Sequence, residues 1–215
     1  MLSTTSYAVL GMLAIRPWTA YELTKQMRRS LDHCWPKTES VLYDEPKRLA
    51  RLGLATATQE PSASGGRSRT HYAITAEGER ALGAWLATAP SPPRVESEAL
   101  LRVLYADHGS VQDLLEALST TRAALREQLR LGLAQVRDYR QDGGPFPDRL
   151  HISVLFADFV ARILSAFDEW AAEAEAEVAS WPDTRDLGAT PETRRRLDEV
   201  IGRLESVLTQ ERTAD

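Results

Sequence analysis

The chain has 215 residues, of which 43% are hydrophobic and 27% are charged, as in a soluble globular protein with a sizeable core. Its single cysteine, Cys34, excludes an internal disulfide, and no apolar run approaches the roughly 20 residues of a membrane span. The first residues lack the basic start and apolar stretch of a secretory signal. We therefore expect a cytoplasmic protein that contacts no membrane.

The net charge of −5 is unevenly distributed along the chain. Residues 1–90 contain 11 Lys+Arg and 8 Asp+Glu, a balance of +3, whereas residues 91–215 contain 15 and 23, a balance of −8. The division falls at Pro90, Pro92 and Pro93, which disfavour regular structure. We expect two domains, 1–90 and 91–215. The basic one suits an anionic partner, although ordinary surface charge is also compatible with +3.

The first domain alternates short helical patterns with one hairpin. The predicted elements are, in chain order, helices at 5–15, 19–31 and 39–53, strands at 54–60 and 70–75, and a helix at 75–87. Thr19 and Thr75 are expected N-caps, and Gly53 is an expected helix end. Four aromatic side chains are expected to contribute to the core: Trp18, Tyr21, Trp35 and Trp85.

Three helices followed by a two-stranded wing predict a winged helix-turn-helix. In this motif the second helix braces the third, and the third can enter a DNA major groove. The tip of the hairpin, residues 61–69, carries Arg67 and Arg69 among small residues. These cations can follow a phosphate strand or enter a minor groove, or they can serve a solubilising loop.

The third helix has an outward face with candidate DNA contacts. Ser40, Tyr43 and Lys47 share this face because their spacing is i, i+3, i+7. Lys37 and Thr38 stand at its beginning, where backbone N–H groups bind phosphate readily. The alternative is that Tyr43 packs under the wing and Lys47 is merely solvated.

The same helix contains a proline. Pro46 lies on the inward face with Leu42 and Leu49, so a kink there leaves the outward face smooth. We expect a bent helix, or a split one in which Asp44 caps the second segment. Asp44 also stands four residues before Arg48, which predicts that the two charges pair.

The second domain is expected to be helical throughout, with helices at 95–109, 110–142, 149–181 and 190–211. A helix of 30 residues spans about 45 Å, too long for so small a domain to cover. A second copy of the chain is the natural partner for such apolar stripes, so we expect a homodimer formed mainly by residues 110–211. In the last helix the residues expected to be buried are Leu197, Val200, Ile201, Leu204 and Leu208.

An aromatic stripe in the second domain is the candidate ligand site. A pocket for a small hydrophobic or aromatic effector uses side chains of this kind, although the same stripe fits a core or a dimer interface. Its members are Phe156, Phe159, Phe167 and Trp170. No nucleophile, phosphate-loop or zinc-hydrolase motif occurs, and the histidines lack metal-ligand spacing. The sequence therefore predicts no enzyme, no cofactor and no metal.

Two stretches, "VLYDEPKRLARLGLA" and "GGRSRTHYAITAEGERALGAWL", resemble the PadR family of bacterial transcription regulators. The matching residues are Leu42-Tyr43, Lys47-Arg48-Leu49, Gly53-Leu54, Gly66-Arg67, Arg69, Tyr72, Ile74, Thr75 and Glu77-Gly78. The resemblance covers residues 6–86, and the helical remainder is similar to the longer subfamily related to virulence-gene activators. Asp44 departs from the family's proline, Pro46 stands at a usually apolar position, and Thr70 replaces a basic residue.

The fold expected is mainly α with a small β-hairpin: an N-terminal winged helix-turn-helix and a C-terminal helical dimerisation domain. The resemblance implies a dimeric regulator of double-stranded DNA, most often a repressor, with hydrophobic small molecules among the family's effectors. The first hypothesis is thus a homodimeric repressor on a palindromic operator. The alternative, suggested by Asp44 and Glu45, is a winged-helix protein-interaction module that does not bind DNA.

Overall fold

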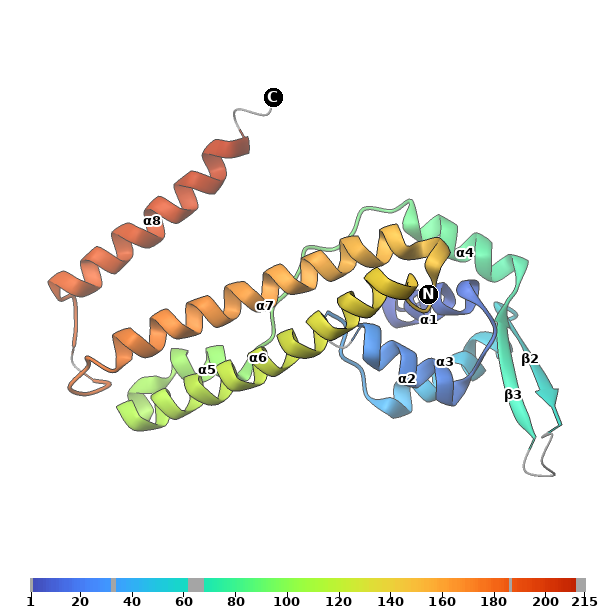
Figure 1. The fold of residues 1–215 in the computed structure, drawn as a ribbon, viewed down its shortest axis with the longest axis horizontal. Helices are drawn as coiled ribbons and strands as arrows, with labels where there is room; N and C mark the ends of the chain where they lie inside the picture. The colour runs from blue at the N-terminus through green and yellow to red at the C-terminus, as the bar shows by residue number, and fades with distance from the viewer. Residues whose placement is uncertain (1, 32–33, 62–67, 186, 212–215) are drawn as a thin grey trace. The chain divides into compact units, whose positions relative to one another are not determined.

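The structure is a computed structural model that describes residues 2–31, 34–61, 68–185 and 187–211. The chain divides into two compact units, Met1–Arg94 and Val95–Asp215 (Figure 1). Helices dominate both units, and the first also contains a small antiparallel sheet. The predicted fold class, mainly α with a winged helix, is confirmed.

The N-terminal unit follows the winged-helix order. Its elements are α1 (Thr4–Ile15), β1 (Trp18–Thr19), α2 (Ala20–Leu31), α3 (Glu39–Arg51), β2 (Ala55–Glu60), β3 (Arg69–Ile74) and α4 (Ala76–Leu86). The wing has three strands in the order β1-β3-β2, with Tyr72 paired to Trp18 on one side and Ala57 on the other. The sequence predicted two strands, because β1 is too short to produce an alternating pattern.

Hydroxyl side chains cap the starts of α2 and α4 in this unit. The Thr75 side chain accepts a hydrogen bond from the Gly78 N–H, as predicted. Thr19 accepts from the Glu22 N–H at 3.2 Å, and Glu22 accepts from the Thr19 N–H at 3.0 Å. This reciprocal pair satisfies two N–H groups at the start of α2. Gly53, with φ of +73°, adopts the left-handed conformation that ends α3.

The core of the N-terminal unit is formed where α1, α2, α3 and the sheet meet. Its fully buried residues include Val9, Leu10, Leu23, Met27, Pro46 and Leu49. Trp18 is buried as predicted, and its Nε1 donates to the Met12 carbonyl at 2.8 Å. Two predictions of burial are wrong: Tyr21 is 68% exposed and Trp35 is 36% exposed. Trp85 is half-buried and stacks on Tyr7 of α1 with ring centroids 4.9 Å apart.

Pro46 lies inside α3, which is one unbroken helix from Glu39 to Arg51. The expected split at Asp44 is therefore wrong. The lost hydrogen bond costs about 3 kcal/mol, whereas burying Leu42 and Leu49 contributes roughly 1.5–3 kcal/mol each. Because Pro46 itself is fully buried on the same side, packing against the core offsets the break in the helix.

The C-terminal unit consists of helices only, as far as the structure describes it. They are α5 (Glu98–Leu104), α6 (Val111–Asp142), α7 (Leu150–Val178) and α8 (Pro191–Glu211), with short 3-10 turns at Ala106–His108 and Pro147–Arg149. Helices α6 and α7 lie side by side and are joined by a turn at Gly143 and Gly144, both with positive φ (Figure 1). The two long helices thus form a hairpin.

Charges and a small cluster hold α6 to α7. Leu114, Leu118, Ala171 and Val178 are the buried cluster. Beyond it, Arg122 of α6 pairs with Glu175 and lies 3.5 Å from Asp168 of α7. The last helix is held in part by Arg196, which pairs with Glu173 at 2.9 Å.

Most of the predicted apolar stripes are not covered within a single chain. The five α8 residues that were predicted to be buried are all exposed in the single chain: Leu197, Val200, Ile201, Leu204 and Leu208. Other exposed apolar side chains on α6, α7 and α8 are Leu131, Leu133, Val136, Ile152, Val154, Leu155, Phe159, Ile163 and Val207. The physical reason is that α6, α7 and α8 extend beyond the short cluster that they share.

The segment Pro147–Val178 is long and apolar enough to cross a membrane by length and composition, with a mean hydropathy of 1.7 in its most apolar window. Only 6% of that window is buried in the single chain. The same helix carries the exposed ion pair Asp158–Arg162, at 2.8 Å. An apolar helix of this kind needs a covering partner, either lipid or protein.

Candidate nucleic-acid interface

Helix α3 has a buried face and an exposed face, and the residues on each are those that the sequence predicts. Leu42, Pro46 and Leu49 point into the core, whereas Ser40, Tyr43 and Lys47 are exposed. Tyr43 is 46% exposed, so its ring does not pack under the wing. The three polar side chains therefore form one outward surface on the helix that a winged-helix protein would insert into a major groove.

Lys47 lies between a carboxylate and an aromatic ring. Its Nζ is 2.8 Å from Asp44 Oδ1 and 4.4 Å from the centroid of the Tyr43 ring. The hydrogen bond that Lys47 donates to Asp44 raises the pKa of Lys47 above its ordinary value, so the ammonium is charged at neutral pH. The expected Asp44–Arg48 pair is wrong: Arg48 pairs with Glu45 at 2.8 Å instead.

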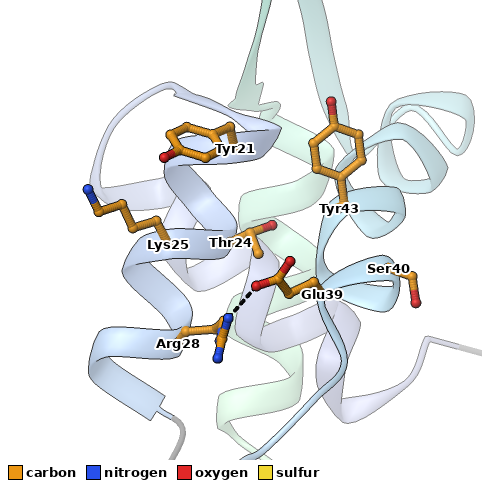
Figure 2. Close-up of a pocket in the computed structure, with 7 residues that line it drawn as sticks. All are labelled: Tyr21, Thr24, Lys25, Arg28, Glu39, Ser40 and Tyr43. Carbon is orange, nitrogen blue, oxygen red and sulfur yellow. Dashed lines mark hydrogen bonds and ion pairs between the residues drawn. The ribbon is translucent and has the colours of Figure 1, made fainter.

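A groove of about 570 Å³ runs between α2 and α3 (Figure 2). Residues that line it are Tyr21, Thr24, Lys25, Arg28, Glu39, Ser40 and Tyr43. In Figure 2 the Arg28 guanidinium of α2 and the Glu39 carboxylate of α3 meet across the groove as an ion pair. The Thr24 hydroxyl is buried and has no hydrogen-bond partner among the described residues. The groove thus brings polar and charged groups from both helices beside the outward face of α3.

The start of α3 is exposed. Thr38 is the N-cap residue, but its side chain makes no capping bond and lies 3.2 Å from the Ser40 hydroxyl. The Lys37 Nζ lies 4.9 Å from the centroid of the exposed Trp35 ring. Helix N-termini carry partial positive charge, so both predicted residues stand where an anion is favoured.

The wing contributes Arg69, which is exposed at the start of β3 opposite Glu60. Arg67, the other predicted contact of the tip, lies outside the described residues. His71 Nε2 is 3.4 Å from Glu60 Oε2. Burial raises the pKa of the Tyr72 hydroxyl, so Tyr72 is a neutral core residue of the sheet.

Tyr21 and Lys25 line the groove between α2 and α3, but the sequence analysis did not identify them as candidate contacts. Both are exposed in the groove, on the face of α2 opposite the buried Leu23 and Met27. The helical period carries this signal, because residues two positions from a buried one fall on the far side of the helix. The expectation that an aromatic residue is buried outweighed the period for Tyr21.

The four residues of the aromatic stripe are only partly brought together. Phe167 and Trp170 contact each other edge to face, with ring centroids 6.1 Å apart, and Trp170 packs on the buried cluster of α6 and α7. Phe159 is 52% exposed, and Phe156 is half-buried. Another cavity, of about 330 Å³, lies at Arg122. None of the four aromatic residues lines this cavity or the α2–α3 groove.

Comparison with known proteins supports the N-terminal part most strongly. Residues 9–84 match the model of the transcriptional regulator PadR-like family. The negative transcriptional regulator PadR of Bacillus subtilis (strain 168) is 28% identical over 101 residues, which are 46% of this chain and 54% of that protein. The aligned segment thus spans about half the length of this curated relative.

Solved structures extend the likeness to both units. A Bacillus subtilis PadR structure in complex with operator DNA has a TM-score of 0.68 at 20% identity, covering 82% of this chain and 99% of that one. The Vibrio cholerae virulence activator AphA has a TM-score of 0.64 at 20% identity, with the same coverage. The PadR structure with p-coumaric acid has a TM-score of 0.61 at 20% identity, covering 84% of this chain and 100% of that one.

At 20% identity these structures establish the fold, whereas the family model identifies the sequence pattern of the winged helix itself. That pattern contains α2, α3 and the wing, the elements that form the surface described above. The N-terminal unit is thus similar to the PadR-like family of transcriptional regulators, whose model matches residues 9–84.

Proposed function

We propose that the chain is a cytoplasmic, homodimeric DNA-binding regulator that represses transcription from a palindromic operator. The observation that carries the proposal is the division of α3 into a fully packed inner face and an exposed outer face with Ser40, Tyr43 and Lys47. In this proposal α3 enters the major groove, the N-terminus of α3 with Lys37 and Thr38 binds phosphate, and Arg67 and Arg69 of the wing follow the backbone.

The dimer is proposed from the uncovered helices of the C-terminal unit. Apolar side chains recur along α8 at three- and four-residue intervals, from Leu197 to Leu208, and all are exposed in the single chain. Contiguous exposed apolar surfaces mark interaction sites in soluble proteins. A second copy offers the same apolar stripes, and a two-fold axis would present two α3 helices to two half-sites.

An effector completes the proposal. The PadR structure with p-coumaric acid motivates a small hydrophobic or aromatic molecule, and Phe156, Phe159, Phe167 and Trp170 are the proposed contacts. Binding among the C-terminal helices would change the separation of the two α3 helices. Two helices that no longer match successive major grooves, about 34 Å apart, lose affinity for the operator.

The proposal is tested by fluorescence anisotropy with a labelled duplex from the region upstream of the protein's own gene. We expect binding that weakens steeply as salt rises, because phosphate neutralisation releases counterions. Sedimentation without detergent is expected to show a dimer. If the chain stays dispersed only in detergent, we infer that the apolar helix α7 contacts lipid instead of a second copy.

The alternative, a winged-helix module for protein partners, rests on the acidic residues of α3. An Arg67→Ala/Arg69→Ala variant distinguishes the two functions. A DNA-binding protein loses affinity and salt dependence in this variant. If neither the wild-type chain nor the variant binds DNA at low salt, the interaction module is the better description.

A further inference from the structure

Two basic side chains on the surface proposed to face DNA, Arg28 and Lys47, are each paired with an acidic side chain. Glu39 and Asp44 lie with Tyr43 and Lys47 on the exposed side of α3, and Arg28 reaches the same side from α2. A phosphate backbone repels carboxylates, so two acids on this face need an explanation in terms of their contacts.

The first acid is Glu39. Its carboxylate accepts from the Arg28 guanidinium across the groove between the two helices (Figure 2). The side chains are 68% and 52% exposed, so water and incoming phosphate can reach both groups. In the free protein the Arg28 charge is therefore already balanced by a carboxylate at the first turn of α3.

The second acid is Asp44, whose Oδ1 lies 2.8 Å from Lys47 Nζ. Asp44 is 71% exposed, and the ammonium is held between this carboxylate and the Tyr43 ring. A phosphate that approaches Lys47 must replace Asp44 as its partner or share the ammonium with it.

The neighbouring pair Glu45–Arg48 has a different character. The Glu45 side chain is only 11% exposed, and Arg48 also donates to the buried Ser6 hydroxyl at 3.1 Å. This pair ties α3 to α1 and belongs to the packing of the unit. Exposed pairs such as Asp44–Lys47 add little to the stability of a protein, so the fold does not require the two outer acids.

We propose that Glu39 and Asp44 are specificity-determining residues, which occupy Arg28 and Lys47 and so suppress binding to DNA of unrelated sequence. The inference rests on the proposed DNA-binding function. Phosphate neutralisation supplies essentially all of non-specific affinity, and two internal carboxylates remove part of it. At the correct operator, base contacts compensate for the exchange. A released carboxylate can itself accept from the amino group of cytosine in the major groove.

The experiment compares the full-length wild-type chain with Asp44→Asn, Glu39→Gln and the double variant. Each is titrated against a random-sequence duplex and against the sequence that the wild-type chain selects from a random pool. We expect affinity for random DNA to rise roughly fivefold per freed cation, and the slope of log affinity against log salt to steepen by about one. Affinity for the selected sequence is expected to rise less, so the specificity ratio falls.

Two matched variants separate this exchange from a general change in charge. Glu45→Gln removes a negative charge one residue away, and we expect no gain in affinity because Arg48 stays directed toward Ser6. In a Lys47→Gln background, Asp44→Asn is expected to have no effect on random DNA. Circular dichroism and thermal unfolding verify that each variant is folded.

Three results would overturn the inference. They are an unchanged affinity of Asp44→Asn and Glu39→Gln for random DNA, an equal gain in Glu45→Gln, and a persisting gain without Lys47. Failure of the proposed function has a different signature, since the wild-type chain then binds neither duplex at low salt.

Discussion

In the N-terminal unit the apolar residues of three helices and a sheet converge on one core, with Leu10, Leu23 and Leu49 fully buried. In the described part of the C-terminal unit, four residues form the buried cluster, and long stripes on α6, α7 and α8 are left exposed. The first unit is complete as a single chain, whereas the second has more apolar surface than it can cover. This difference supports the proposal that the first unit recognises DNA and that the second associates with another copy of the chain.

The largest effect is expected from Leu204→Asp on α8. Burying a leucine is worth roughly 1.5–3 kcal/mol, and a symmetric interface contains the contact twice. We therefore expect the dimer to weaken by about 3 kcal/mol or more, at least a hundredfold in dissociation constant. Sedimentation velocity over a concentration series measures this change.

Leu86→Asp is the matched control, since Leu86 of α4 is 68% exposed and Leu204 is 61% exposed. This variant is expected to dimerise like the wild-type chain. Equal self-association of all three proteins would remove α8 from the interface and weaken the contrast between the two units.

The N-terminal core is tested by Leu49→Ala. Leu49 is fully buried in α3, and such truncations cost about 2–5 kcal/mol because they leave a cavity. We expect faster hydrogen exchange throughout α1, α2 and α3 and a lower free energy of unfolding. Leu52→Ala, three residues later and 52% exposed, is expected to change stability by no more than about 0.5 kcal/mol. Similar losses in both variants would contradict a self-contained core.

A third test concerns the backbone contact that joins α4 to the end of α3. A Cβ added at Gly78 would lie 2.2 Å from the Leu54 carbonyl oxygen, whereas one added at Gly83 meets nothing within 4 Å. Gly78→Ala is expected to destabilise the unit by about 1–3 kcal/mol. Gly83→Ala in the same helix is expected to stabilise it by up to about 1 kcal/mol, because alanine favours helix. Urea denaturation compares them, and a neutral Gly78→Ala would mean that the contact is loose.

Much of the fold could be predicted from local patterns. The caps at Thr19 and Thr75 and the inward position of Pro46 follow from spacing and side-chain chemistry alone. The strand β1 could not be predicted, because two residues carry no period and its pairing with Tyr72 joins distant parts of the chain. The surface that covers α8 could not be predicted, because a helical period identifies an apolar face but not what packs against it.

The candidate interface was predictable to a similar extent. The outward face of Ser40, Tyr43 and Lys47 follows from helical spacing. The choice of ion pairs does not, since Asp44 has cations at i+3 and i+4 and side-chain direction decides between them. The pair of Arg28 with Glu39 depends on how α2 packs against α3, which no local pattern contains.

The smallest effect concerns helix caps, which the two units share. Glu22 closes the cap of α2 with Thr19, and Asp113 closes that of α6 with Ser110. The backbone N–H of Thr19 holds the pKa of Glu22 below its ordinary value of 4.5. The stabilisation by a carboxylate with a lowered pKa is fully present above 4.5 and is lost as pH falls through the folded-state pKa. Glu22→Gln is therefore expected to destabilise the N-terminal unit by about 1 kcal/mol at neutral pH, and the difference from the wild-type chain should shrink on acidification. Hydrogen exchange in α1–α3 at neutral and at acidic pH measures the stability of the variant and of the wild-type chain.

Asp113→Asn is the counterpart in α6, and we expect only the effect of this variant to depend on the concentration of the dimer. A concentration-dependent effect of Glu22→Gln would show that the N-terminal unit also relies on a partner.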